Sequence, residues 1–113
     1  MSERTISLLL DDIKNAITAI LQYTQNYSYD QYEADLKTRH AVERNFEIIG
    51  EAASSVPENY KAVHPNIEWR ILKDFRNFII HDYFGINNAI VWETIQLRLR
   101  DLLSDINALP DSD

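Results

Sequence analysis

Hydrophobic residues recur at three- and four-residue steps along most of the chain, which is the spacing of amphipathic helices with one buried face. The first such run extends from about Ser2 to Gln25, and polar side chains such as Asp12 and Asn15 occupy its opposite face. Its expected inward residues are Ile6, Leu9, Leu10, Ile13, Ile17, Ile20 and Leu21. The chain is therefore predicted to begin with a long amphipathic helix.

A second long helix is predicted from near Asp30 to just before Pro57, and Asp30 and Glu33 form a plausible cap pair at its start. At 1.5 Å per residue this helix would be roughly 40 Å long. Its expected inward residues are Tyr32, Leu36, Val42, Phe46, Ile49, Ala53 and Val56. A helix of that length suits a bundle.

Two more main helices follow a connecting segment between Pro57 and Pro65, which is predicted to be a short helix or turn. One is capped by Asn66 and ends near Gly85, with inward residues Ile71, Leu72, Phe75, Phe78 and Ile79. The other begins at Asn87 or Asn88 and ends at Pro110, with inward residues Ile90, Trp92, Ile95, Leu99, Leu102, Leu103, Ile106 and Leu109.

Short links between long amphipathic helices indicate an all-α fold, an antiparallel bundle of four to five helices. The 113 residues suit one domain spanning 1–113, because single domains cluster near this length. With only 2 Gly and 3 Pro, the chain has few of the turn residues that a β-sandwich or barrel requires.

Charge and composition narrow the classes of function. The net charge of −7 argues against broad, non-specific binding to nucleic acids or anionic membranes, so any nucleic-acid site must be a local basic patch. The absence of cysteine excludes disulfides, cysteine-based zinc sites and cysteine nucleophiles. The apolar run from Ile6 to Leu10 is too short for a membrane span or a signal segment, so we expect a cytoplasmic protein without membrane association.

The third predicted helix carries the expected basic patch. On a helical wheel its apolar residues occupy one arc, and the opposite arc holds Trp69, Arg70, Lys73, Arg76, Asn77 and His81. Three fixed cations and a histidine thus share one side of a helix in an acidic protein. Arg70 and Lys73 are candidates for binding the phosphates of a nucleic acid.

Asn77 and His81 are four residues apart and would be neighbours, so the amide could fix the tautomer of the imidazole. Arg76 and His81 are about 140° apart on a regular helix and converge only if the helix distorts or two chains meet. Because Asp82 would otherwise point into the core, we expect the helix to loosen between His81 and Gly85. A structural role also fits, with Arg76 paired to a carboxylate and His81 near a helix C-terminus.

Other enzyme signatures are missing from the sequence. There is no Gly-rich phosphate loop, no G-x-S-x-G and no H-E-x-x-H. The only metal-like spacing is His40-x-x-Glu43, and a di-metal bundle requires additional inward carboxylates. No metal site and no cofactor are predicted.

The residues from Arg76 to Tyr83 have the form R-N-x3-H-x-Y, with P-x-I-x-W upstream of this string and Y-F-G-I at its end. Together with the segment ERNFEIIGEAA (43–53), this pattern resembles the HEPN superfamily, specifically the HepT-like toxins that are partnered by minimal nucleotidyltransferases. The resemblance extends over nearly the whole chain.

That resemblance implies a homodimeric, metal-independent endoribonuclease in which the R-x4-H motifs of two protomers face each other. Carried over to this chain, Arg76 and His81 are catalytic, Asn77 is the supporting polar residue, and the substrate is an mRNA or tRNA. It further implies a type VII-like toxin–antitoxin pair, in which the cognate nucleotidyltransferase antitoxin attaches AMP to Tyr83 and silences the nuclease.

One position departs from the resemblance. Asp74 stands where many relatives are expected to have a small residue, and a carboxylate near Arg76 would weaken the binding of phosphate. Glu47 and Glu51 on the second helix are candidates to balance Arg76. Two other functions fit the sequence: a non-catalytic nucleotide- or substrate-binding subunit of a two-component nucleotidyltransferase, and a structural dimerisation bundle.

Overall fold

The computed structural model describes residues 5–77 and 87–110, and every regular element within these ranges is a helix. The predicted all-α class is therefore confirmed. The helices are α1 (Ile6–Tyr23), α2 (Tyr29–Ala34), α3 (Leu36–Ser55), α4 (Glu58–Val63), α5 (Trp69–Asp74), α7 (Asn88–Leu97) and α8 (Leu99–Asn107).

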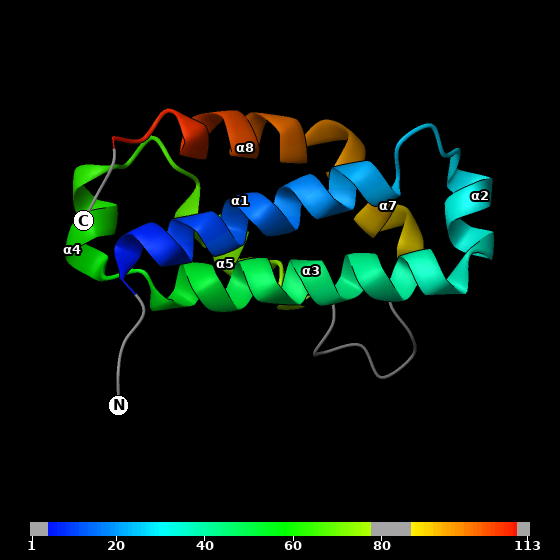
Figure 1. Cartoon of the computed structure of the whole chain (residues 1–113), viewed down its shortest axis with the longest axis horizontal. Coiled ribbons are helices and arrows are strands. Elements are labelled where there is room, and N and C mark those ends of the chain that lie inside the picture. Colours follow the sequence, from blue (N-terminus) through cyan, green and yellow to red (C-terminus); the bar gives the residue numbers. More distant parts are fainter. Residues whose placement is uncertain (1–4, 78–86, 111–113) are drawn as a thin grey trace.

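Helix α1 is the axis of the bundle. Figure 1 shows α3 and α8 on its two sides, both running antiparallel to it, and α1 packs against both of them. Helices α2 and α4 lie at opposite ends of the molecule, while α5 packs against α3. The Thr5 hydroxyl accepts a hydrogen bond from the Leu8 backbone N–H at 3.2 Å, so a side-chain cap defines where α1 begins. The predicted antiparallel helical bundle is confirmed.

The buried side chains form one hydrophobic core cluster, which includes most of the predicted inward residues. Leu36 and Ile90 are exceptions, because their exposed fractions are 53% and 52%. Val91 is buried instead of Ile90, so the predicted inward face of the last helix was wrong by one residue in its first turn.

The predicted second helix is two helices, α2 and α3, because the helical conformation is interrupted at Asp35. The Asp35 carboxylate accepts hydrogen bonds from the Thr38 backbone N–H at 3.1 Å and from the Thr38 hydroxyl at 2.7 Å. These bonds cap α3 and compete with helix continuation through Asp35. The predicted cap pair of Asp30 and Glu33 was also wrong, since Ser28 and Gln31 form the capping box of α2.

The third predicted helix starts later than expected. Asn66 does not cap it; α5 begins at Trp69, because the buried Ile67 donates its backbone N–H to the His64 carbonyl in a preceding turn. Helix α5 ends at Asp74, and Phe75 and Arg76 lie in a turn. Phe78, Ile79 and the expected loosening between His81 and Gly85 lie outside the described residues.

The remaining helices follow the prediction more closely. The predicted element between Pro57 and Pro65 is helix α4. Asn87 is the N-cap of α7, where its side-chain oxygen accepts from the Ile90 backbone N–H at 3.1 Å. The last predicted helix is divided into α7 and α8 at Arg98, whose guanidinium donates to both carboxylate oxygens of Glu68 at 3.1 Å.

None of the helices in residues 5–77 and 87–110 combines the length and the apolar character that a membrane crossing requires.

The Asp35 cap makes the stability of the fold depend on pH. Hydrogen bonds from the Thr38 and Tyr27 hydroxyls lower the pKa of Asp35 from its usual 3.8 to about 2. A carboxylate with a lowered pKa stabilises the fold fully above its unfolded pKa, and this contribution is lost as pH falls through the folded pKa. We expect Asp35→Asn, which can still accept a cap hydrogen bond, to reduce the loss of thermal stability between about pH 4 and pH 2.

Thermal unfolding followed by circular dichroism across this pH range measures the effect, with Asp11→Asn on the exposed side of α1 as the matched control. A destabilisation by Asp35→Asn of the same size at every pH would contradict the role assigned to the charged carboxylate.

Candidate functional site

The turn that carries Arg76 is anchored on helix α3 by an aromatic pair. The rings of Phe46 and Phe75 have centroids 5.0 Å apart and meet edge to face at 83°. Both side chains are buried, and this geometry is favourable for aromatic rings. Arg76 follows directly and is half-buried. The anchor on α3 therefore determines where the Arg76 backbone lies.

Gly50 lies one helical turn after Phe46 on the same face of α3, and its lack of a side chain leaves space for Arg76. A Cβ at Gly50 would lie 2.6 Å from the Arg76 Cβ and 2.8 Å from the Arg76 backbone nitrogen. Both distances are shorter than real side chains adopt, and the second involves backbone that cannot rotate away. Glycine inside a helix costs stability, and the close approach of Arg76 explains why it is present here.

Two acidic residues of α3, Glu47 and Glu51, are engaged elsewhere. Arg44 forms ion pairs with Glu47 at 2.8 Å and with Glu51 at 3.7 Å, so these carboxylates do not balance Arg76 as the sequence had suggested. No ion pair joins Arg76 to any carboxylate in the described part of the chain. Its guanidinium is therefore not neutralised by a described acidic residue.

The other predicted site residues fall into two groups. Arg70 and Lys73 are exposed on α5, and Asn77 is exposed directly after the turn. His81 and Tyr83 lie outside the described residues, so their distances to Arg76 are not described. Trp69 lies on the arc opposite the predicted core face, and the sequence left its burial open; it is buried, and its ring packs against Tyr60 of α4.

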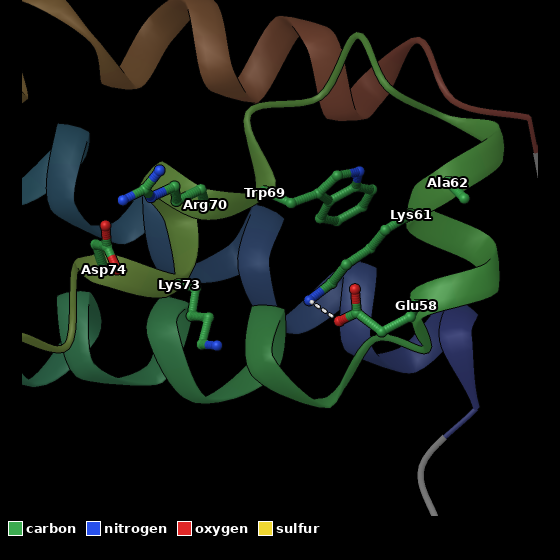
Figure 2. A pocket seen from close by; sticks show the side chains of 7 residues that line it. All are labelled: Glu58, Lys61, Ala62, Trp69, Arg70, Lys73 and Asp74. Atoms are coloured by element: carbon green, nitrogen blue, oxygen red, sulfur yellow. Dashed lines mark hydrogen bonds and ion pairs between the residues drawn. The ribbon is translucent and has the colours of Figure 1, made fainter.

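Arg70 and Lys73 line a cleft of about 530 Å³ between α4 and α5. Figure 2 shows Lys61 and Glu58 reaching into this cleft from α4, opposite the side chains from α5. Asp74 also lines the cleft, at the end of α5. The sequence did not single out Lys61, because α4 and α5 carry no shared periodicity that would place their cations together.

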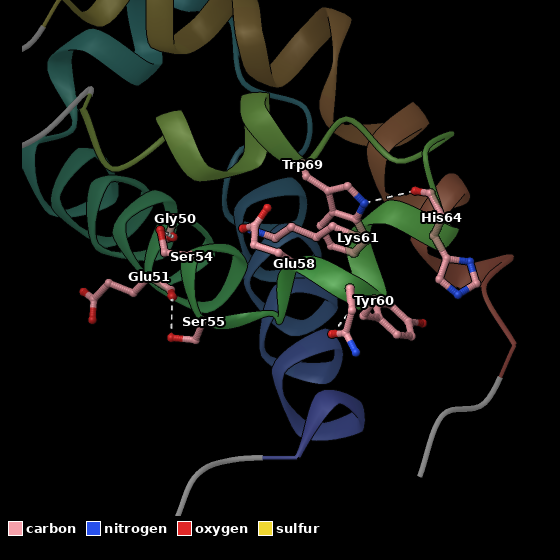
Figure 3. A network of polar contacts seen from close by, with 10 residues as sticks. Gly50, Glu51, Ser54, Ser55, Glu58, Tyr60, Lys61, His64 and Trp69 are labelled. Carbon is pink, nitrogen blue, oxygen red and sulfur yellow. Dashed lines mark hydrogen bonds and ion pairs between the residues drawn. The ribbon is translucent and has the colours of Figure 1, made fainter.

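Three rings hold α4 against the start of α5. The centroid of the Tyr60 ring lies 4.4 Å from that of His64 and 6.2 Å from that of Trp69. The Trp69 indole N–H donates a hydrogen bond to the His64 backbone carbonyl at 3.0 Å. These contacts among Tyr60, His64 and Trp69 form a bracket between α4 and α5, and Figure 3 shows it beside the ion pair of Lys61 with Glu58. A buried indole N–H requires an acceptor, and the His64 carbonyl supplies it. The bracket sets the separation of the two walls of the cleft.

Within the described residues no group of three or more His, Asp or Glu side chains is placed to hold a metal ion. His40 is exposed on α3, and burial raises the pKa of the nearby Glu43 carboxyl. The two residues thus do not form part of a larger metal-binding cluster in the described ranges.

Comparison with known proteins supports the resemblance found in the sequence. The family model for ribonuclease HepT-like proteins matches residues 13–109. A protein of Thermococcus cleftensis named “Probable ribonuclease HepT” is 39% identical over 87 residues, which is 77% of this chain and 79% of that protein. A Methanocaldococcus jannaschii protein named “Putative RNase” is 30% identical over 109 residues, 96% of this chain and 90% of that protein. No solved structure matches the chain.

The close approach of Gly50 and Arg76 yields a test. Gly50→Ala should lower the free energy of unfolding by about 1–2 kcal/mol, because overpacking against Arg76 outweighs the better helix propensity of alanine. Chemical denaturation measures the change, and Glu51→Ala at the next, exposed position is the control. A Gly50→Ala protein more stable than the parent would show that Arg76 does not need this space.

Proposed function

The chain belongs to the ribonuclease HepT-like family, and from that premise we propose that it cleaves RNA with Arg76 and His81 as catalytic residues and Asn77 as a supporting residue. The observation that carries the proposal is the position of Arg76. Its backbone and Cβ pack closely against Gly50, and no carboxylate of the described residues forms an ion pair with it. A half-buried arginine that has no ion-pair partner among the described residues favours an anionic ligand, and RNA supplies one in each phosphate.

The chemistry needs only proton transfer and charge stabilisation, because RNA carries its own nucleophile. The 2′-oxygen attacks the adjacent phosphorus, and the bond from phosphorus to the 5′-oxygen breaks. In this proposal His81 acts in moving the proton from the 2′-hydroxyl to the leaving oxygen, since an imidazole exchanges protons near neutral pH. Arg76 remains charged and binds the phosphate oxygens as they gain charge. The products are a 2′,3′-cyclic phosphate and a 5′-hydroxyl.

We further propose that the active form is a homodimer. On one regular helix Arg76 and His81 would diverge by about 140°, whereas two protomers with facing motifs can supply the two groups to one phosphate. The whole chain, 1–113, would act as one domain in this assembly, and no metal ion or cofactor takes part.

Regulation is proposed to act through Tyr83. The cognate minimal nucleotidyltransferase would transfer AMP from ATP to the Tyr83 hydroxyl and release pyrophosphate. The resulting phosphodiester anion would lie near Arg76 in the sequence, compete with RNA phosphate for the cation and block access. The protein would then be the toxin of a toxin–antitoxin pair that cleaves cytoplasmic mRNA or tRNA until the antitoxin modifies it.

Substitution of His81 tests the catalytic assignment. His81→Ala should reduce cleavage of single-stranded RNA by about 10²- to 10⁴-fold, the usual contribution of a general acid–base group. Arg76→Ala should also reduce cleavage, and the exposed Arg100→Ala on α8 is the control of equal charge change. Gel analysis of end-labelled RNA measures the rate, and mass spectrometry identifies the cyclic phosphate. EDTA should not change the rate, and DNA should remain uncut.

Cleavage that persists in His81→Ala, or that stops on addition of EDTA, would refute this mechanism. Tight nucleotide binding without any cleavage would instead support a nucleotide-binding subunit of a nucleotidyltransferase.

The modification of Tyr83 has its own measurement. After co-expression with its nucleotidyltransferase partner, intact-protein and peptide mass spectrometry should find at least one AMP on the peptide containing Tyr83, and the modified protein should no longer cleave RNA. Tyr83→Phe should remain unmodified there and active. An unmodified Tyr83 in an inhibited complex would show that the partner silences the enzyme by another route.

A further inference from the structure

The cleft between α4 and α5 reverses the local sign of charge in an acidic protein. The cations Lys61, Arg70 and Lys73 line it together with the carboxylates of Glu58 and Asp74, whereas the whole chain has a net charge of −7. Three cations against two carboxylates leave the lining with a formal charge of +1, and a locally positive cleft concentrates anions. This cleft is therefore suited to an anion despite the repulsive charge of the molecule.

The cations differ in how they are held. Arg70 and Lys73 are exposed and form no ion pair with another described residue. Lys61 has a side chain only 11% exposed, and its ammonium lies 3.4 Å from the carboxylate of Glu58, which is 89% exposed. A long ion pair with a solvated carboxylate contributes little energy, so a phosphate can replace Glu58 as the partner of Lys61.

The aromatic wall points to recognition of charge rather than of bases. Trp69 is only 8% exposed, and its N–H is already bound by the His64 carbonyl. Figure 2 shows the Lys61 side chain extending beside Trp69 toward the opening between α4 and α5. Base-stacking platforms need an open ring face, and the buried indole does not offer one. The groups available to a ligand are therefore charged nitrogens, which bind phosphate.

The cleft also lies close to the catalytic candidate along the chain. Arg76 lies three positions after Lys73 in the chain, so their Cα atoms are at most about 11 Å apart. A single strand of RNA held at Arg76 can therefore continue into the cleft with its next phosphates.

We propose that this cleft binds the phosphates of the RNA strand that flank the bond to be cut, with Lys61 as the third cation and Glu58 as the competing anion. The proposal rests on the proposed ribonuclease function. It extends that function from the reacting phosphate to the neighbouring nucleotides and gives α4 a role in substrate binding.

The test compares substrates of different length. With a single-stranded RNA of about a dozen nucleotides, Lys61→Ala should raise KM roughly two- to fivefold more than it does with a dinucleotide, which is too short to reach the cleft. In the His81→Ala background, binding of the same RNA should lose about 0.7 from the slope of log affinity against log salt. Lys37→Ala is the control of equal charge change, because Lys37 is exposed on α3 at the opposite end of the molecule from α4.

Glu58→Gln gives a test of opposite sign. It removes the carboxylate that competes for Lys61 while preserving the shape of the side chain, so it should lower KM for the longer RNA. Because this variant is expected to improve binding, a folding defect cannot imitate the result. In Glu58→Gln/Lys61→Ala the gain should disappear.

The outcomes separate the two proposals. If the parent cleaves RNA but Lys61→Ala matches Lys37→Ala on both substrates, the cleft is not a phosphate site and the ribonuclease assignment stands. Equal loss on the dinucleotide and the longer RNA also rejects the cleft, since Lys61 would then act at the reacting phosphate or on the fold. If the parent does not cleave RNA, but the His81→Ala protein binds it with the expected dependence on Lys61, the cleft is a phosphate site for RNA and the proposed ribonuclease function fails.

Discussion

The contact on which the candidate site depends is that of Phe75 and Arg76 with one face of α3. Phe46 holds the Phe75 ring edge to face, and one helical turn later Gly50 leaves no side chain between α3 and the Arg76 backbone. Aromatic packing and the missing Cβ act together, because the first fixes the turn and the second allows it to approach. A guanidinium can direct its charge at a substrate only if its backbone is held in place, and α3 supplies that support.

The position of Arg76 matters for function because of the charges around it. A protein with a net charge of −7 repels RNA over most of its surface, so productive encounters depend on the places where the sign reverses. Arg70, Lys73 and Arg76 follow one another along α5 and the turn after it, and no described carboxylate forms an ion pair with them. Acidic residues on α3 are paired with Arg44 instead. The basic side of α5 therefore remains available for a phosphate-bearing ligand.

Helix α4 both packs against Trp69 at the start of α5 and supplies a cation to the cleft. Its Tyr60 and the His64 carbonyl hold the buried Trp69, and this bracket brings Lys61 to the side of α5 that carries Arg70 and Lys73. At the other end of the molecule, Asp35 divides what would otherwise be one long helix, and the division lets α2 pack against α7. Two short helices thus close the ends of a bundle whose centre is α1.

The sequence by itself determined the helical class, most of the core face, the Asn87 cap and the placement of basic residues on one side of α5, because these properties repeat with the period of a single helix. Its R-N-x3-H-x-Y string also pointed to the family that the comparisons support. Only the tertiary structure decided that Gly50 accommodates Arg76, that Trp69 is buried and that Lys61 joins the cleft. Each of these depends on contacts between segments separated along the chain, and the periodicity of one helix contains no information about which neighbour will cover it.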